Sequence, residues 1–123
     1  MSPDRTPRIL VVEDEPAVRR LVARALQEEG YEVVAVSDGQ AGLDAVSRAD
    51  APYDLVVTNN HMPRMGGAEL IAELRSRFPG LLILHIDDLS QPLSAALPPD
   101  VPTLYKPFRI ERLLEVVRER LRR

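Results

Sequence analysis

Apolar residues in this chain occur partly in short continuous runs, which are separated by stretches with helical spacing. Residues 9–12 form one such run, and the mainly apolar segments 33–36, 55–58, 81–86 and 103–105 include only Thr58, His85 and Thr103 as polar positions. A continuous apolar run of this length is typical of a strand that is covered on both faces. The pattern therefore predicts five buried strands.

Helical spacing fills most of the intervals between these runs. Five apolar residues after the first run recur at intervals of three and four: Val18, Leu21, Val22, Ala25 and Leu26. This spacing predicts one apolar stripe on a helix, with Pro16 near its start and Gly30 at its end. Similar patterns predict helices at residues 41–49, 70–78 and 110–121.

The interval before the last strand differs from the others. Residues 88–102 contain Pro92, Pro98, Pro99 and Pro102, and a proline inside a helix costs about 3 kcal/mol. We therefore expect a shortened fourth helix near residues 93–97. One interpretation is simply a shortened connection on the surface of the protein.

Strands that alternate with helices predict right-handed crossovers and a parallel sheet. Five such units suit a flavodoxin-like α/β fold with a doubly wound parallel sheet and strand order 2-1-3-4-5. We expect one domain over residues 9–123, preceded by a disordered or extended segment at residues 1–8. Ligands of such sheets bind at the carboxyl ends of the strands, near the point where the strand order reverses.

Composition excludes several classes of protein. The chain has 123 residues and no cysteine, so disulfides and thiolate metal sites are excluded. No apolar run approaches the roughly 20 residues that a membrane span needs, and the amino-terminal segment does not resemble a signal peptide. A net charge of −3 argues against a nucleic-acid partner. We expect a cytoplasmic protein without a membrane or nucleic-acid partner.

Polar residues with useful chemistry follow the last apolar position of four predicted strands. They are Glu13, Asp14, Asn59, Asp87 and Lys106. Because the carboxyl ends of parallel strands share one edge of the sheet, we expect these side chains to converge there.

Together these residues resemble those of a response-regulator receiver domain. The resemblance rests on Glu13 and Asp14 after the first strand, Asn59 at the end of the third, and Lys106 followed by Pro107. It implies that residue 59 should be an aspartate that accepts a phosphoryl group from a histidine kinase. A carboxylate can form an acyl phosphate because it is anionic, and the neutral carboxamide of Asn59 cannot do this usefully.

Two further positions depart from what the resemblance implies. Asp87 stands where receivers have a Ser or Thr hydroxyl, and a carboxylate there would repel a phosphoryl group. Thr103 stands at the place of the switching aromatic residue, with Tyr105 two residues later. An engineered change at Asn59 would leave the rest of the switch intact, so the joint pattern favours a natural, degenerate receiver. The proline-rich interval then has a second interpretation, as a remodelled signalling surface.

These departures predict a pseudo-receiver, a phosphorylation-independent protein-interaction module that is not an enzyme. The expected partner is a histidine kinase, another receiver or an output protein. A homodimer through the face formed by the fourth helix, fifth strand and last helix is also considered. The alternative is a conventional phosphoacceptor receiver in which Asn59 is engineered or Asp87 or Asp54 accepts instead. The chain ends soon after its last helix, which suits a stand-alone protein or a receiver cut from a hybrid kinase.

The charges of the pocket suggest how it is held without phosphate. We hypothesise that Lys106 pairs with Asp87 or Asp14 and fixes one constitutive arrangement, because such a pair attracts by about 4 kcal/mol before desolvation. A solvated acidic cleft without a specific role is the alternative. Glu13 and Asp14 are suitable Mg²⁺ ligands, but with a neutral residue at position 59 we expect only weak affinity.

The two histidines are expected to have ordinary roles. His61 lies in a loop at the pocket mouth, where it is expected to be exposed rather than a relay histidine or a metal ligand, because nothing pairs with it at helical spacing. His85 lies inside the fourth strand and is expected to be packed or hydrogen-bonded.

Overall fold

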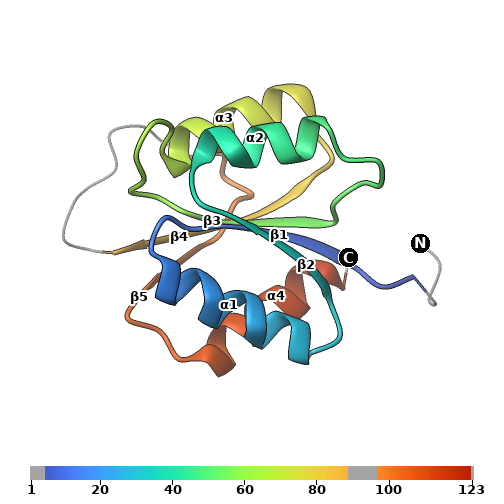
Figure 1. Cartoon of the computed structure of the whole chain (residues 1–123), viewed down its shortest axis with the longest axis vertical. Coiled ribbons are helices and arrows are strands. Elements are labelled where there is room, and N and C mark those ends of the chain that lie inside the picture. The colour runs from blue at the N-terminus through green and yellow to red at the C-terminus, as the bar shows by residue number, and fades with distance from the viewer. Residues whose placement is uncertain (1–4, 89–96, 123) are drawn as a thin grey trace.

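A computed structural model describes residues 5–88 and 97–122 of the chain (Figure 1). Its elements are β1 (Arg8–Val12), α1 (Pro16–Glu28), β2 (Glu32–Val36), α2 (Gly39–Ser47), β3 (Leu55–Asn59), α3 (Gly67–Arg77), β4 (Leu82–Asp88), β5 (Thr103–Lys106) and α4 (Ile110–Leu121).

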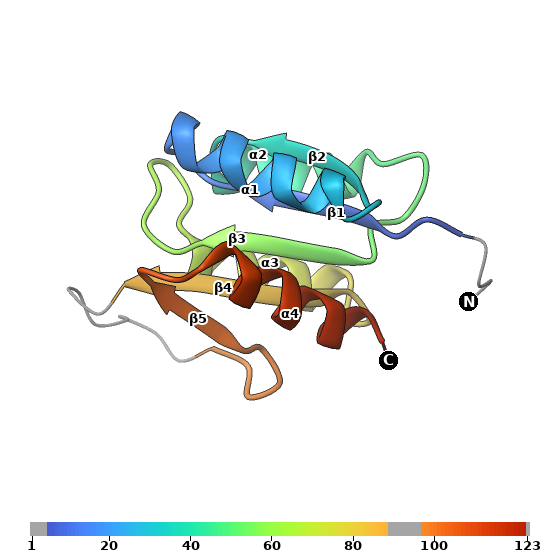
Figure 2. The same ribbon diagram turned by 90° about the horizontal axis from the view of Figure 1, so that it is seen from below.

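The five strands form one parallel sheet in the order β2-β1-β3-β4-β5. This order confirms the predicted flavodoxin-like fold. Figure 1 shows α2 and α3 on one face of the sheet and α1 and α4 on the other, and Figure 2 shows the second face from below. The order reverses between β1 and β3, so the carboxyl ends of these two strands flank the expected ligand position.

Each face of the sheet buries its own apolar cluster. Residues of β1 alternate between them: Ile9 and Val11 pack with α1 and α4, while Leu10 and Val12 pack with α2 and α3. Successive residues of a strand point to opposite faces, so both sets are apolar in a sheet that is covered on both sides. This arrangement explains why the strands read as continuous apolar runs.

One residue of the predicted stripe on the first helix is exposed. Val22 and Leu26 of α1 are buried, but the prediction is wrong for Leu21, which is 56% exposed. The helix meets the sheet along the line Val18, Val22 and Leu26, which recur every four residues and all belong to the same apolar cluster. Leu21 lies at the edge of this narrow contact and faces solvent.

The strands extend further than the apolar runs predict. Asn59 is the last residue of β3, Lys106 is the last of β5, and β4 continues through Asp87 and Asp88. The backbone of β4 continues to Asp88 because this residue lies opposite Lys106 in the parallel pairing of β4 with β5. The side chains of Asn59, Asp87 and Lys106 therefore project from regular strands, whereas Glu13 and Asp14 lie in the connection between β1 and α1.

The beginning of α2 also differs from the prediction. The helix starts at Gly39 instead of residue 41, because the carboxylate of Asp38 accepts a hydrogen bond from the Ala41 N–H at 2.8 Å and caps the helix. The short helix predicted near residues 93–97 lies, apart from Leu97, outside the described residues. None of the described helices is long and apolar enough to cross a membrane.

Candidate functional site

The polar residues predicted to converge lie together at the carboxyl edge of the sheet. Asn59 ends β3 and is only 7% exposed, and Glu13, directly after β1, is also buried. Asp87 is buried near the end of β4, and Lys106 ends β5. The parallel sheet aligns these strand ends, so a small polar pocket forms at one edge.

The side-chain amide of Asn59 is hydrogen-bonded to three other groups of this pocket. Its Nδ2 donates to Glu13 Oε2 at 3.3 Å, to Asp14 Oδ1 at 3.3 Å and to the His61 carbonyl at 3.1 Å. All three partners are acceptors, which fixes the orientation of the amide, because an amide oxygen would repel each of them. A neutral donor therefore lies between two carboxylates.

Lys106 pairs with a carboxylate other than the two that were predicted. Its Nζ lies 3.5 Å from Glu13 Oε1, and no salt bridge joins it to Asp87 or Asp14 within the described part of the chain. The hypothesis was therefore right that a pocket carboxylate holds the lysine but wrong about which one. Glu13 has one more methylene than an aspartate, and this longer side chain reaches the lysine.

The environment of Glu13 changes its acidity. Burial raises the pKa of this carboxyl, while the Glu15 N–H, 3.1 Å from Oε2, and the Lys106 charge both act to lower the pKa. The nearby Asp14 raises the pKa further, and the net direction is upward. One backbone donor and one cation thus offset only part of the penalty for burying the charge.

Asp87 faces a different partner. Its side chain is 4% exposed, and its Oδ1 lies 3.4 Å from His61 Nε2 and accepts the Asp88 N–H at 2.9 Å. His61 is exposed, as predicted, but the sequence prediction missed its contact with Asp87. The two residues lie 26 positions apart in the sequence. Their contact could have been predicted only from the fact that both lie near the carboxyl ends of the neighbouring strands β3 and β4.

His85 and Thr103 form a second polar pair on the neighbouring part of the sheet. His85 is fully buried, as predicted, and its Nδ1 lies 3.1 Å from Thr103 Oγ1. Burial lowers the pKa of the His85 imidazole, whose Nε2 has no hydrogen-bond partner among the described residues. Thr103 is thus occupied by a partner of its own, while Tyr105 is exposed.

Asp54, considered as an alternative acceptor, lies away from the pocket. It directly precedes β3, at the opposite end of the strand from Asn59. Its carboxylate accepts the Arg8 N–H at 2.7 Å and pairs with the Arg5 guanidinium. The structure therefore brings Asp87, and not Asp54, to the edge that holds Asn59.

The donor set around Asn59 bears on magnesium binding. Carboxylates of Glu13 and Asp14 and the carbonyl of His61 are hard oxygen ligands of the kind that Mg²⁺ prefers, with metal–oxygen distances of about 2.0–2.1 Å. The Asn59 amide nitrogen already lies among these three oxygens. The set does not fit Mg²⁺ as arranged, since the amide has to turn its oxygen inward first.

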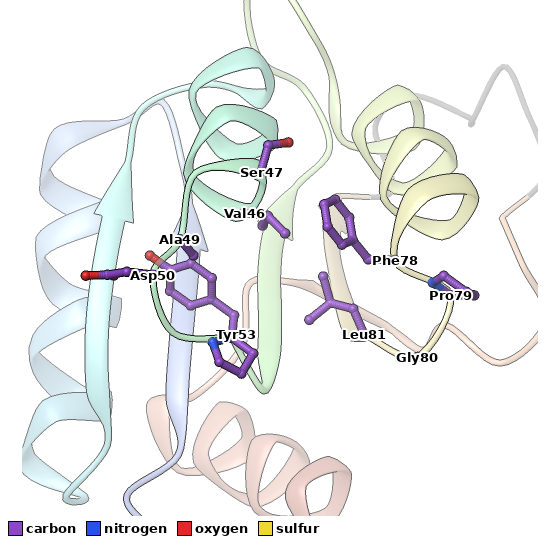
Figure 3. Close-up of a pocket in the computed structure, with 10 residues that line it drawn as sticks. Val46, Ser47, Ala49, Asp50, Tyr53, Phe78, Pro79, Gly80 and Leu81 are labelled. Carbon is purple, nitrogen blue, oxygen red and sulfur yellow. The ribbon is translucent and has the colours of Figure 1, made fainter.

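A cleft of about 530 Å³ lies elsewhere (Figure 3), between the end of α2 and the loop before β4. Figure 3 shows the side chains of Val46, Tyr53, Phe78 and Leu81 around it. These residues precede β3 and β4, so the cleft is at the amino edge of the sheet. It shares no residue with the polar pocket.

Comparison with known proteins shows relatives of the same kind. A model of the response regulator receiver domain family matches residues 9–118. The chain is 39% identical over 119 residues to the response regulator MprA of Mycolicibacterium vanbaalenii, covering 94% of this chain and 51% of that protein. It is 35% identical over 116 residues to the sensor kinase CckA of Brucella abortus, covering 92% of this chain and 12% of that protein.

Solved structures of response regulators and receiver domains have a similar fold. The response regulator TrrA from Thermotoga maritima, crystallised in complex with Mg²⁺ and BeF, has 32% identity and a TM-score of 0.84, covering 94% of this chain and 100% of that one. The receiver domain of the hybrid histidine kinase CckA has 34% identity and a TM-score of 0.76, covering 93% and 98%.

The family match has a clear limit in length. The chain spans about half the length of the MprA relatives and a much smaller part of the CckA kinase. The activities of those whole proteins are therefore not transferred with the match. Because the family model covers most of the chain, and the sheet order agrees with it, the chain belongs to the response regulator receiver domain family of two-component signalling.

Proposed function

We propose that this receiver domain acts as a phosphorylation-independent protein-interaction module. The observation that supports the proposal best is the Asn59 amide, which donates to both acidic side chains of the pocket. Asn59 offers no anionic oxygen for attack on phosphorus. It also supplies hydrogen bonds that the acids would otherwise take from a cation or from water.

The remaining contacts of the pocket support a single constitutive arrangement. Lys106 is paired with Glu13, and Asp87 is paired with His61. In each pair both side chains come from the pocket itself, so neither depends on a bound phosphoryl group. Hydrogen bonds to charged groups contribute about 1.5–3 kcal/mol each, and distances of 3.3 Å place the Asn59 bonds at or below the lower end of this range.

Asp87 also argues against a phosphoryl group in the pocket. Its buried carboxylate lies where the resemblance implies a neutral hydroxyl donor, and an ionised carboxylate can only accept hydrogen bonds. A phosphoryl group placed there would meet a like charge in a partly desolvated site. We expect weak, non-physiological affinity for Mg²⁺ in the same pocket, since the neutral residue at position 59 removes one anionic ligand.

The proposed partner is another protein of two-component signalling: a histidine kinase, a second receiver or an output protein. Exposed Tyr105 offers an aromatic contact on the outer face of β5, the edge strand of the sheet, and aromatic residues are enriched in protein interfaces. A homodimer through this face is one form that such an interaction takes.

Intact-mass measurement after incubation with acetyl phosphate and Mg²⁺ tests this function. We expect no added phosphoryl mass on the parent chain, because its pocket lacks an acceptor carboxylate at position 59. A receiver with an intact aspartate serves as the positive control in the same reaction. Addition of one phosphoryl group to an aspartate of the parent chain, located by peptide mapping, would contradict the proposal and favour Asp87 as an alternative acceptor.

A further inference from the structure

The carboxylate of Asp87 is buried, and among the described residues its salt-bridge partner is the imidazole of His61 instead of the expected lysine. Its side chain is 4% exposed, and the lysine of the pocket is directed to Glu13 instead. Both contacts that the structure gives the carboxylate reach the same oxygen, Oδ1. A buried carboxylate is stable only when it is paired or binds a metal, so the environment of Asp87 indicates a further positive charge.

Three potential metal ligands gather at this point. His61 Nε2 and one carboxylate oxygen each from Asp87 and Asp88 all lie within 4.8 Å of one another. The histidine comes from the loop after β3, and both aspartates come from the carboxyl end of β4. These ligand atoms are separate from the side chains of Glu13 and Asp14 that surround Asn59.

We propose that His61, Asp87 and Asp88 bind a divalent transition metal ion, with Zn²⁺ as the best match. One imidazole nitrogen and two carboxylate oxygens are ligands typical of zinc, whereas Mg²⁺ avoids imidazole. With metal–ligand bonds of about 2.1 Å, neighbouring ligands of a tetrahedral site lie about 3.4 Å apart. The observed 3.4 Å between His61 Nε2 and Asp87 Oδ1 fits that spacing.

The charge of the cluster also suits a dication. The two aspartates and the imidazole carry a formal charge of −2 at neutral pH, which is opposite to the charge of one Zn²⁺ ion. Three protein ligands leave the fourth position of the metal open to water or to a ligand from a partner. This inference does not depend on the proposed function, because metal binding is measured without any phosphorylation.

His61 also connects this cluster to the polar pocket. Its carbonyl accepts the Asn59 amide while its imidazole faces Asp87. A metal bound to the imidazole therefore holds the same residue whose backbone forms one wall of the pocket. By linkage, an ion that binds only the folded state raises its free energy of unfolding.

Calorimetric titration of the tag-free chain with Zn²⁺ near neutral pH tests the site. We expect one ion per chain with sub-millimolar affinity, and a rise in thermal midpoint with zinc. His61→Gln, at a partly exposed side chain, should weaken zinc binding by about tenfold or more. Asp87→Asn should do the same, and Glu69→Gln, which removes an exposed carboxylate from α3, is the matched control.

The chain has two histidines, and the other, His85, is fully buried. Loss of zinc affinity in His61→Gln therefore identifies the imidazole ligand, and this variant does not disturb the core. Equal affinity in the parent and His61→Gln would overturn the proposal, as would absence of binding at millimolar zinc. Displacement of zinc by an equal concentration of Mg²⁺ would place the ion at Glu13 and Asp14 instead, and would also overturn it.

Discussion

At the scale of single residues, the amide of Asn59 has the largest effect on the site. It contacts both acidic side chains and a backbone carbonyl, and a carboxylate at the same place would repel both acids. The sequence predicts only that a neutral side chain stands at position 59. The structure shows in addition that this side chain is hydrogen-bonded to three groups of the pocket.

Asn59→Asp should destabilise the chain when no divalent ion is present. The substitution replaces two favourable N–H···O contacts with repulsion among three carboxylates, and we expect a loss of about 1–3 kcal/mol in the free energy of unfolding. Added Mg²⁺ should restore much of the loss in this variant and change the parent little. Urea denaturation with and without Mg²⁺ measures both effects.

Gln27→Glu on the exposed surface of α1 is the control for that experiment, because it adds the same charge away from the pocket. If Asn59→Asp unfolds at the same urea concentration as the parent in the absence of Mg²⁺, the amide does not stabilise the pocket as described.

At the scale of elements, the loop between β3 and α3 is tied to the start of α2. The Asp38 carboxylate caps α2 through the Ala41 N–H and also pairs with Arg64 of the loop. The hydrogen bond from Ala41 and the Arg64 guanidinium lower the pKa of Asp38. Gly67 at the far end of the loop lies so close to β3 that a Cβ atom there would approach the Asn59 carbonyl oxygen to 2.3 Å.

Asp38→Ala should lower the free energy of unfolding by about 1–2 kcal/mol, the usual effect of losing a helix cap. Arg64→Ala should have a smaller effect, because the arginine is largely exposed and exposed ion pairs contribute about 0–1 kcal/mol. Chemical denaturation of the two variants measures which one loses more free energy of unfolding. A larger loss in Arg64→Ala would show that the ion pair, and not the cap, holds this loop.

At the scale of the whole molecule, the sequence predicts the fold better than it predicts the contacts within the site. A parallel sheet that is covered on both faces needs apolar side chains at successive positions of each strand. The sequence shows this in its five mainly apolar segments. Leu21 was mispredicted since the width of a helix contact depends on its neighbours. The partners of Lys106 and His61 were missed because side-chain reach and direction across strands leave no mark on the local pattern.

The stability of the whole domain should depend on pH through His85. Burial lowers the pKa of this imidazole, so the folded state stays neutral while the unfolded state takes up a proton below its ordinary value of about 6.5. This group therefore reduces the free energy of unfolding as pH falls from about 6.5 towards its lower folded pKa. Glu13 acts in the opposite direction, because its raised pKa favours protonation in the folded state.

His85→Leu separates the two effects. Unfolding by urea between about pH 7.5 and about pH 5.5 should show that the parent loses more stability on acidification than this variant does. Parallel pH profiles for the parent and His85→Leu would show that the buried imidazole is not the group responsible.

The Asn59 amide also has a consequence for how such a domain can change in evolution. Asparagine and aspartate codons differ by one base, so a single mutation can place an aspartate at position 59. That mutation would first remove the hydrogen bonds that Glu13 and Asp14 accept, while the buried carboxylate of Asp87 would remain in the same pocket. Under the proposed function, a change at position 59 alone therefore reduces stability without producing a phosphoacceptor switch, and further changes in the pocket would have to accompany it.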